Sequence, residues 1–481
     1  MIHRSYSCLV GILLIAFSMA GCATTQPSSP QYLLSNYGAI GDGKTVNTRA
    51  IQGAIDNIAA SGGGTLVVPA GTYLTGAIFF KPGVSLLIQK DGVIKGTTNQ
   101  ADYPLVSTRW EGVEGMHTSA LVNFDGSSHI SMSGEGMIDG SGDAWGGGRG
   151  RFGAGAGGRG GAATQPGARG GRGGPGGGFG GGGRGFAGGA TRPTSGPSGS
   201  IRMADGFVFQ QVGRPRLICF KNCQDVEISG LHLQKQAIWC LHLLYCQNVK
   251  VENLNIDSVA RTPSSDGMDI DSCSNIEISH CTISCNDDDI TLKSGKDNDG
   301  RRVNRPTENV WIHDCDIRLG DGIAMGSEVT GSVRHVLVEN CTFTNTNHAA
   351  RIKSQPSRGG IVEDIVYRDI VLKNPSEAVD FELAWDLRLQ RLPAVPNLTI
   401  CRDIHLIRFS GVARSGGTMA GVDGGPISDV HFQDCNFSAQ RGLRISHAVD
   451  IDTSGLNLKV QNGPPIIMGG APTTRPVAPP A

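Results

Sequence analysis

The chain has 481 residues, a formal net charge of −1, and 39% hydrophobic residues. This length allows one large domain or a few smaller ones. The near-zero charge excludes a bulk electrostatic attraction to nucleic acid, so we expect no nucleic-acid partner. After the N-terminus no run of apolar residues is long enough to cross a bilayer. Internal membrane-spanning segments are therefore not predicted.

The first residues have the pattern of an export signal. Arg4 precedes an apolar run from Leu9 to Ala20, which is too short to span a bilayer and suits the core of a signal peptide. Small residues directly before Cys22 resemble a bacterial lipobox, whose cysteine is lipidated after cleavage. We expect a signal peptide over residues 1–21 and a lipidated cysteine with a polar tether over 22–32. An ordinary cleaved signal with an incidental cysteine is the alternative.

The residue after Cys22 helps to predict which membrane would hold the lipidated protein. Ala23, in place of Asp, resembles lipoproteins that are sent to an outer membrane. We expect an exported protein anchored in the outer membrane through lipid on Cys22, with a periplasmic or extracellular location as the alternative. The lipid is the only membrane contact that we expect.

A short pattern recurs through the second half of the chain: apolar, any, apolar, two of any kind, apolar, any, apolar. Its eight copies begin at Val226, Val249, Ile276, Val310, Val336, Ile365, Ile404 and Val430. Successive copies start 23 to 39 residues apart. Each copy fits a short strand, a turn and a second short strand, and such a unit buries its apolar face only by stacking. The pattern predicts an all-β, right-handed parallel β-helix, because a β-sandwich would not keep one phase over eight copies.

The chain has 13 cysteines, and most follow the repeat. One repeat position holds Cys281, Cys315, Cys341 and Cys435, and another holds Cys223, Cys246, Cys273 and Cys401. Leu, Ile and Phe fill the first position in other copies, so these cysteines are expected to be small buried hydrophobic residues in internal ladders. Their spacing is that of the repeat rather than of a zinc site. An oxidising compartment would allow one or two disulfides, with Cys219, Cys240 and Cys285 as the candidates.

A short helix is predicted before the repeats. Asn47 or Thr48 can cap it, and its apolar face would contain Ala50, Ile51, Ala54, Ile55 and Ile58. This helix would close the open end of the coil and protect its edge from pairing with other chains.

Residues 146–200 differ from the rest of the chain. They are dominated by Gly, Arg, Ala, Pro and Ser and contain seven Arg but no Asp, Glu or Lys. Such a segment cannot bury a core, so we predict a disordered insertion within a β-helix domain over residues 33–463. An arginine-rich arm that touches a polyanion is the functional interpretation, and a flexible loop is the simpler one. The Pro-rich residues 464–481 are also predicted to be unstructured.

Two acidic blocks lie about one repeat apart. Asp266 precedes Asp287 by 21 residues and Asp288 by 22. If one repeat is one turn of the coil, Asp266 lies directly over the other two. Converging carboxylates are what acid/base cleavage of a glycosidic bond requires. The alternative is that these carboxylates only bond to turn backbones.

Several motifs occur in a fixed order along the chain. They are Tyr37–Gly43 (YGAIGDG), Gly134–Gly140 (GEGMIDG), Arg214–Ile218 (RPRLI), Ser264–Asp269 (SSDGMD), Asn286–Ile290 (NDDDI) and Arg351–Lys353 (RIK). Their order and spacing resemble glycoside hydrolase family 28, the polygalacturonases, over roughly residues 33–460. The resemblance implies a secreted bacterial enzyme that degrades pectin on a β-helix scaffold.

The resemblance also implies roles for the carboxylates. Asp287 corresponds to the general acid, and Asp266 and Asp288 to the pair that holds and activates water for direct inversion. Inverting glycosidases usually separate their carboxyl groups by about 6.5–9.5 Å. Because neighbouring strands of a sheet lie about 4.8 Å apart, we expect carboxylates one turn apart to fit that window.

Four residues are candidates for substrate binding. Arg351 and Lys353 share a strand face, and together they suit the carboxylate of a uronic acid; Lys293 joins this set. The fourth is Asp321, which occupies the place of the family's histidine in a Gly-His-Gly motif. Its negative charge is expected to raise the pKa of a neighbouring acid and to repel a substrate carboxylate. This substitution predicts weak action on plain polygalacturonate.

The sequence therefore predicts an inverting hydrolase that cleaves galacturonate-containing bonds in pectin. The alternatives are a rhamnogalacturonan or exo-acting galacturonide hydrolase, a calcium-dependent pectate lyase, and a non-catalytic surface protein that binds glycans. We expect a pectic polysaccharide or oligogalacturonide substrate, no cofactor, no metal and a monomer.

Overall fold

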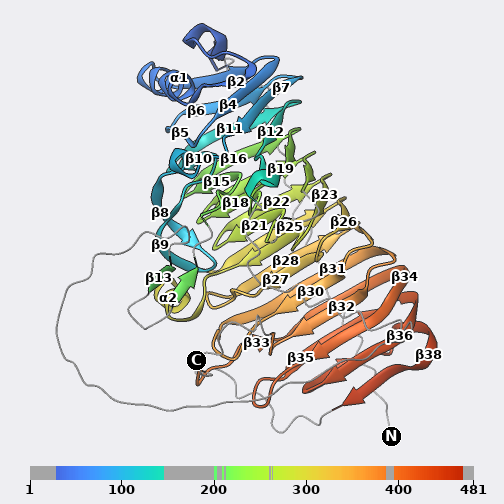
Figure 1. The fold of residues 1–481 in the computed structure, drawn as a ribbon. Helices are drawn as coiled ribbons and strands as arrows, with labels where there is room; N and C mark the ends of the chain where they lie inside the picture. Colours follow the sequence, from blue (N-terminus) through green and yellow to red (C-terminus); the bar gives the residue numbers. More distant parts are fainter. Residues whose placement is uncertain are drawn as a thin grey trace, which may run out of the picture.

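The computed structural model describes residues 29–145, 200–202, 208–210, 213–258, 262, 264–385 and 395–469. Over these residues the chain winds into a right-handed parallel β-helix whose turns stack from the N-terminal to the C-terminal end (Figure 1). The predicted fold class is confirmed. The predicted signal peptide, the lipidation at Cys22 and nearly all of the 146–200 insertion lie outside the described residues.

Three faces run along the coil, each made of strands from successive turns. The first face contains β1 (Gln31–Leu33), β3 (Gly64–Val68), β6 (Val84–Ile88), β11 (Ser128–Gly134), β16 (Gln224–Ser229), β19 (Gln247–Glu252), β22 (Ser274–Ser279), β25 (Thr307–His313), β28 (Val333–Glu339), β33 (Ile400–Cys401), β35 (Ile427–Gln433) and β37 (Ala448–Asp452). The second contains β2 (Asp42–Val46), β4 (Gly71–Thr75), β7 (Gly92–Gly96), β12 (Met137–Asp139), β17 (His232–Gln234), β20 (Asn255–Asp257), β23 (Thr282–Cys285), β26 (Asp316–Leu319) and β29 (Thr342–Thr344).

The third face carries the acidic motifs and was not part of the predicted repeat. It contains β5 (Ile78–Phe80), β10 (Val122–Asp125), β15 (Ile218–Lys221), β18 (Leu241–Leu244), β21 (Met268–Asp271), β24 (Ile290–Lys293), β27 (Ile323–Gly326), β30 (His348–Lys353) and β32 (Glu377–Glu382). Towards the C-terminus, long strands bend across more than one face: β31 (Ile361–Lys373), β34 (Ile404–Ala420), β36 (Cys435–Ser446) and β38 (Leu456–Gly469).

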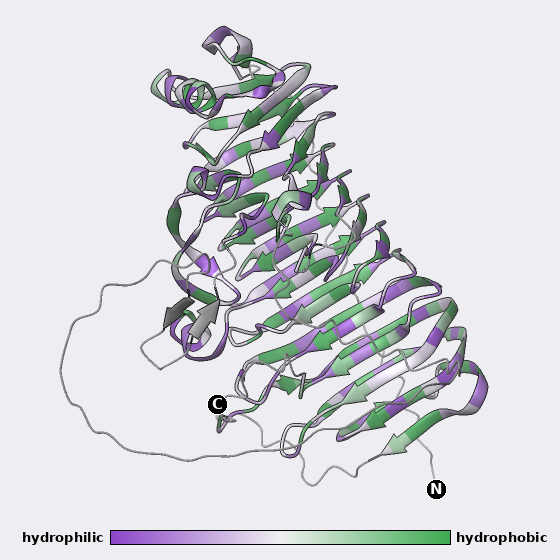
Figure 2. Cartoon of the chain, viewed as in Figure 1, coloured by the Kyte–Doolittle hydropathy of each residue, from purple (hydrophilic) through white to green (hydrophobic). Residues whose placement is uncertain are grey.

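Hydrophobic and hydrophilic residues alternate along many strands (Figure 2). The buried apolar side chains form one core inside the coil. One inward column runs through Leu66, Leu86, Met132, Ile228, Val251 and Ile278, each paired with the next. Cys281, Cys315, Cys341 and Cys435 are all at most 3% exposed. The eleven described cysteines are buried and unpaired, so the prediction of internal cysteine ladders is confirmed and the candidate disulfides of Cys219, Cys240 and Cys285 do not form.

Asparagines recur at equivalent positions of three successive first-face strands, β19, β22 and β25. Asn248, Asn275 and Asn309 have φ values of 54°, 58° and 57°, a left-handed conformation that Asn tolerates better than most residues. Their side-chain amides also bond to one another, at 2.9 Å from Asn275 to Asn248 and 3.0 Å from Asn309 to Asn275. This ladder fixes the phase of successive turns.

The predicted helix is present as α1 (Thr48–Ala60), and it covers the N-terminal end of the coil (Figure 1). Its buried face contains four of the five predicted residues, Ile51, Ala54, Ile55 and Ile58, while Ala50 is only partly buried. The predicted capping bond is not made, because the side chain of Asn47 instead bonds to the backbone of Ile40 and Thr45.

Two hairpins and a short helix of the described residues were not predicted. An antiparallel hairpin of β8 (Leu105–Trp110) and β9 (Val113–Thr118) lies over the C-terminal ends of third-face strands, and α2 (Asp297–Val303) packs against it. The completely buried Arg109 anchors the hairpin with an ion pair of 2.7 Å from Nη1 to Asp271 Oδ1. A second short hairpin joins β13 (Ser200–Arg202) to β14 (Val208–Gln210). No helix in the described residues is long and apolar enough to cross a membrane.

The predicted boundaries of the β-helix need correction at both ends. The first strand, β1, begins at Gln31, inside the predicted tether. The last strand, β38, continues to Gly469 by pairing with β36, so the prediction of an unstructured tail is wrong for residues 464–469. Backbone pairing with a neighbouring strand orders this segment despite its two consecutive prolines.

Candidate active site

The acidic blocks lie where two neighbouring strands of the third face begin. Met268 of β21 pairs with Ile290 of β24, so Asp266 and Asp288, each two residues earlier, lie one above the other. The backbone N–H of Gly267 donates to the carbonyl oxygen of Asp288 at 2.9 Å, which holds this alignment. The prediction that one repeat stacks Asp266 over the Asp287–Asp288 pair is therefore confirmed by the register.

The three carboxylates converge. Asp266, Asp287 and Asp288 each place an oxygen within 4.8 Å of the other two. Asp266 is 3% exposed and Asp288 is 1% exposed, whereas Asp287 is partly open to solvent. Asp287 is thus the member of the trio that an incoming substrate can reach most directly.

Burial and mutual repulsion set the protonation of two of these groups. Burial, together with the charge of Asp288, raises the pKa of Asp287 to about 6. Burial and the charges of Asp269 and Asp287 raise the pKa of Asp266 well above its usual range. A carboxyl group with a raised pKa keeps a proton that it can donate. Asp287 combines this property with access to solvent, as a general acid requires.

Asp288 faces two cations. Lys353 Nζ lies 2.6 Å from Asp288 Oδ2, and Arg351 Nη1 lies 3.4 Å from Asp288 Oδ1. Both cations come from β30 and are less than a tenth exposed, and Lys353 also lies 5.1 Å over the ring of Trp385. Charge-assisted contacts of this kind stabilise a carboxylate anion. Asp288 is therefore the carboxylate of the trio that pairs with both cations of β30.

Arg351 contacts further carboxylates. Its Nη1 also lies 2.5 Å from Asp321 Oδ2, and its Nε donates to Asp380 Oδ2 at 3.1 Å. Burial alone would raise the pKa of Asp321, but the charges of Arg351, His348 and Lys353 outweigh it and lower the pKa to about 2. The predicted substrate-binding cations thus serve as internal counter-ions in the substrate-free protein, and their predicted contact with a substrate carboxylate stays a prediction.

Lys293, the third predicted cation, is 5% exposed and surrounded by acids. Its Nζ lies 3.2 Å from Glu328, 3.5 Å from Asp269 and 3.9 Å from Asp266. Burial alone would raise the pKa of Glu328, but Lys293 and nearby cations lower it to about 2. Lys293 therefore links the acidic trio to a buried ion-pair network, which the sequence did not predict.

Turn geometry holds the acidic block in place. Asp289, beside the trio, accepts hydrogen bonds from the Gly322 N–H at 2.9 Å and from Cys285 Sγ at 3.2 Å. A Cβ atom at Gly320 would lie 2.3 Å from Asp289 Oδ2, so this close approach requires glycine. Gly322 has a φ of 80°, which also favours glycine. The conformation of the motif that contains Asp321 thus depends on its two flanking glycines.

An aromatic pair joins the hairpin to the site. Trp110 of β8 and Trp239, just before β18, have ring centroids 4.3 Å apart. Lys293 Nζ lies 4.8 Å from the centroid of Trp239. The hairpin therefore packs directly against the residues that surround the acidic trio.

Five polar residues in or beside the site were absent from the predicted set: Asp269 and Glu328, which contact Lys293, and the neighbouring cluster of His348, Glu377 and Asp380. The register gives the signal that could have found them. Arg351 pairs with Asp380, 29 residues later, and His348 pairs with Glu377 at the same interval. The repeat pattern covers only strands of the first two faces, so it does not align the third-face residues of one turn with those of the next.

The structure places one oxygen of each carboxylate within 4.8 Å of an oxygen of the other two, because Asp287 and Asp288 are consecutive and Asp266 is one strand away. The predicted separation of about 6.5–9.5 Å refers to whole carboxyl groups and stays a prediction. A hydrogen bond from water to a carboxylate oxygen measures about 2.5–3.0 Å. Two carboxylate oxygens up to 4.8 Å apart can therefore both accept from one water molecule between them. The aligned pair of Asp266 and Asp288 has the geometry to do so.

Comparison with known proteins gives one family. The family described as Glycosyl hydrolases family 28 matches residues 205–439, which include all three carboxylates. A probable polygalacturonase of Vitis vinifera is 27% identical over 351 residues, covering 71% of this chain and 60% of that protein. An exo-poly-alpha-D-galacturonosidase of Dickeya chrysanthemi is 28% identical over 361 residues, covering 73% and 56%. The chain thus spans less than two thirds of the length of these two relatives.

Solved structures share the fold. An exopolygalacturonase from Thermotoga maritima superposes with a TM-score of 0.71 at 24% identity, covering 92% of each chain. A family 28 exopolygalacturonase from Yersinia enterocolitica superposes with a TM-score of 0.69 at 18% identity, covering 94% of this chain and 79% of that one.

Proposed function

Because the chain belongs to glycoside hydrolase family 28, we propose that it hydrolyses galacturonate-containing glycosidic bonds in pectin. The observation that carries this proposal is the convergence of three carboxylates within 4.8 Å, one partly exposed with a raised pKa and one paired with two cations. The names of the relatives support galacturonate as the sugar.

The proposed reaction is a single displacement at the anomeric carbon. Asp287 donates its proton to the leaving glycosidic oxygen as the carbon–oxygen bond breaks. Asp288 accepts a proton from the attacking water, whose oxygen forms the new bond to the carbon. Asp266 holds the same water from the other side. The product has inverted configuration, because the water enters opposite the leaving group.

The experiment that tests this proposal is product analysis with polygalacturonate and rhamnogalacturonan side by side. Hydrolysis releases reducing ends and saturated products, and the first products distinguish attack within the chain from attack at its ends. Intact polymer after long incubation would favour a non-catalytic glycan-binding protein. Monomeric galacturonate as the first product would identify an exo-acting enzyme, the activity named in the Dickeya relative.

A calcium-dependent pectate lyase is the second candidate. Three carboxylates within 4.8 Å form an oxygen-only ligand set of the kind that Ca²⁺ prefers. The lyase would also need a basic group to abstract a proton, and Arg351 is poorly suited. Burial alone would lower its pKa, but Asp321, Asp288 and Asp380 raise the pKa, so the guanidinium keeps its proton. Unsaturated products that disappear with chelator would establish the lyase.

The raised pKa of Asp287 predicts how the activity depends on pH. Asp321 is one of the charges that raise the pKa of Asp287. The general acid works only while protonated, so kcat/KM should fall as pH rises through about 6. Asp321→Asn removes the negative charge, lowers the pKa of Asp287 and should move this fall to lower pH. Asp321→His should act in the same direction while the imidazole is charged.

A pH–rate profile of each variant checks this prediction, with Asp257→Asn on the outer surface as a control for the substitution itself. A fall at unchanged or higher pH in both variants would contradict it. We further propose that Asp321 makes plain polygalacturonate a poor substrate and favours decorated pectin or chain ends. An increased preference of Asp321→His for polygalacturonate would support this specificity.

We also propose that the protein is exported and anchored by a lipid on Cys22. The support is the apolar run before Cys22 and the small residues next to it. Cys22→Ala should move the protein from the membrane fraction to the soluble fraction and abolish labelling with radioactive palmitate. Unchanged fractionation and labelling would contradict the anchor.

A further inference from the structure

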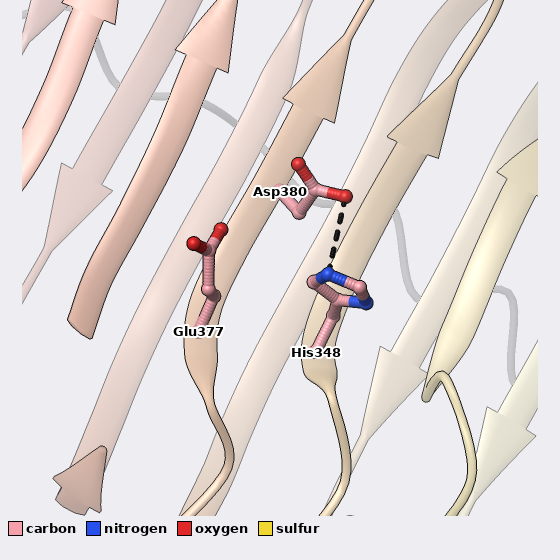
Figure 3. A group of neighbouring side chains, drawn as sticks. All are labelled: His348, Glu377 and Asp380. Carbon is pink, nitrogen blue, oxygen red and sulfur yellow. Dashed lines mark ion pairs between the residues drawn. The ribbon is translucent and has the colours of Figure 1, made fainter. Parts of the chain in front are cut away.

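One cluster of charged side chains beside the active site has no role in the proposed reaction. His348 of β30 and Asp380 of β32 form an ion pair of 3.4 Å between Nε2 and Oδ2, and Glu377 lies next to them (Figure 3). His348 and Glu377 are paired in register, and Arg351 is paired with Asp380. The register of β30 and β32 therefore fixes the positions of these three residues. Asp380 is the member of the cluster that contacts Arg351.

A chain of contacts leads from this cluster to the trio. Asp380 Oδ2 accepts a hydrogen bond from Arg351 Nε at 3.1 Å. Arg351 Nη1 then reaches Asp321 at 2.5 Å and Asp288 at 3.4 Å. Because the guanidinium is planar and rigid, fixing Nε fixes the direction of Nη1.

We propose that Asp380, supported by His348, is a positioning residue that holds the Arg351 guanidinium against Asp288. This inference rests on the proposed hydrolase function and adds a residue to it. Asp380 is buried, with 7% of its surface exposed, and its ion pairs within the described residues are with Arg351 and His348, so its effect on Asp288 passes through Arg351. Without it, Arg351 keeps only its contacts with Asp321 and Asp288, and its side chain is free to turn about its long axis.

The same three side chains raise the question of a metal ion. His348, Glu377 and Asp380 each offer a ligand atom within 4.8 Å of the others. However, Arg351 Nε contacts the Asp380 oxygen that faces His348, and a fixed guanidinium charge opposes a second cation at that oxygen. The contacts therefore favour an ion-pair network over a metal site.

A double-mutant cycle tests the proposal. Asp380→Ala should lower kcat about 10-fold or more with KM changed less than about 3-fold, because the affected group acts in the transition state. Asp380→Asn keeps an oxygen for Arg351 Nε and should lose less. In an Arg351→Ala background, Asp380→Ala should cost less than about 2-fold, because residues that act through one another are not additive.

The matched control is Glu377→Gln, on the same strand and beside the same histidine. Burial and the charge of Asp380 raise the pKa of Glu377 to about 7, so at pH 5 glutamine replaces an uncharged carboxyl group. Its kcat should stay within about 2-fold of the wild type at that pH. Thermal unfolding of every variant shows whether the protein remains folded.

The outcomes separate the claims. No activity in the wild type would reject the proposed function itself. An active wild type in which the losses at Asp380 and Arg351 multiply would reject the positioning role. Titration of the full chain with Zn²⁺ by calorimetry adds a further check: stoichiometric binding that is lost in His348→Ala would replace the positioning role with a metal site.

Discussion

Asp287→Asn is expected to lower kcat by about 10²-fold or more while leaving the binding of oligogalacturonides nearly unchanged. Asn has the shape of Asp but no acidic proton, and its oxygen can still accept the 3.0 Å hydrogen bond that Asp287 Oδ1 accepts from the Asp288 N–H. The loss therefore reports proton donation rather than collapse of the turn. Steady-state kinetics give kcat, and calorimetry with the inactive variant gives the affinity.

The matched control for this substitution is Asp257→Asn, on the exposed second face, which should keep the wild-type rate. Asp266→Asn and Asp288→Asn should cause losses of similar size to Asp287→Asn, because each removes one carboxylate of the same site. Near wild-type rates in all three variants would show that the chemistry takes place elsewhere.

Lys353→Ala has the second largest expected effect. The sequence alone predicts that it mainly weakens binding of a substrate carboxylate and so raises KM. The 2.6 Å contact of Lys353 with Asp288 predicts a loss in kcat as well, because it leaves a buried carboxylate without its closest cation. Positioned proton transfer typically contributes about 10²–10⁴-fold, so displacing Asp288 should lower kcat by roughly 10²-fold or more.

Steady-state kinetics of Lys353→Ala show how much of the lost activity comes from a lower kcat and how much from a higher KM. Lys373→Ala, on the exposed side of β31, is the control. A loss in kcat on galacturonate oligomers and on their carboxyl-reduced forms would support the counter-ion role. A loss confined to KM and to carboxylated substrates would mean that Lys353 reads the substrate instead. Arg351→Ala should show the same division.

The fold was predictable wherever strands have one face in the core and one in solvent. Strands β22 and β25 alternate in this way, and their inward Ile278 and Ile312 mark the repeat. Strands β24 and β27 of the third face are buried along their whole length, because ion pairs and the β8–β9 hairpin cover their outer sides. No alternation of exposed and buried residues marks such strands.

The hairpin was not predictable for a related reason. It lies outside the repeat, and its anchor joins Arg109 to Asp271, residues 162 positions apart. A polar residue such as Arg109 in a short segment indicates a loop, and only the tertiary ion pair explains its complete burial. Asp380 and Glu328 lie only 29 and 35 residues from their partners Arg351 and Lys293, but on or next to third-face strands, where no alternation aligns one turn with the next.

The acidic trio was predictable because its spacing equals one turn of the coil, and the structure brings Asp266, Asp287 and Asp288 together. The predicted cations are also at the site, but the sequence could not show that they already pair with carboxylates. That pairing depends on the register of β24, β27 and β30, where Gly326 separates Lys293 from Lys353. Asp321 raises the pKa of Asp287, as its charge predicted, while its own pairing with Arg351 was not expected.

The most direct test of the account is the configuration of the first products released from an α-linked galacturonate polymer. Proton NMR during the first minutes of digestion distinguishes the two anomers before they interconvert. The account predicts saturated products whose new reducing ends appear first in the β configuration, because water held by Asp266 and Asp288 attacks opposite the leaving oxygen. Reducing ends that appear first in the α configuration, or products with an unsaturated ring, would contradict it.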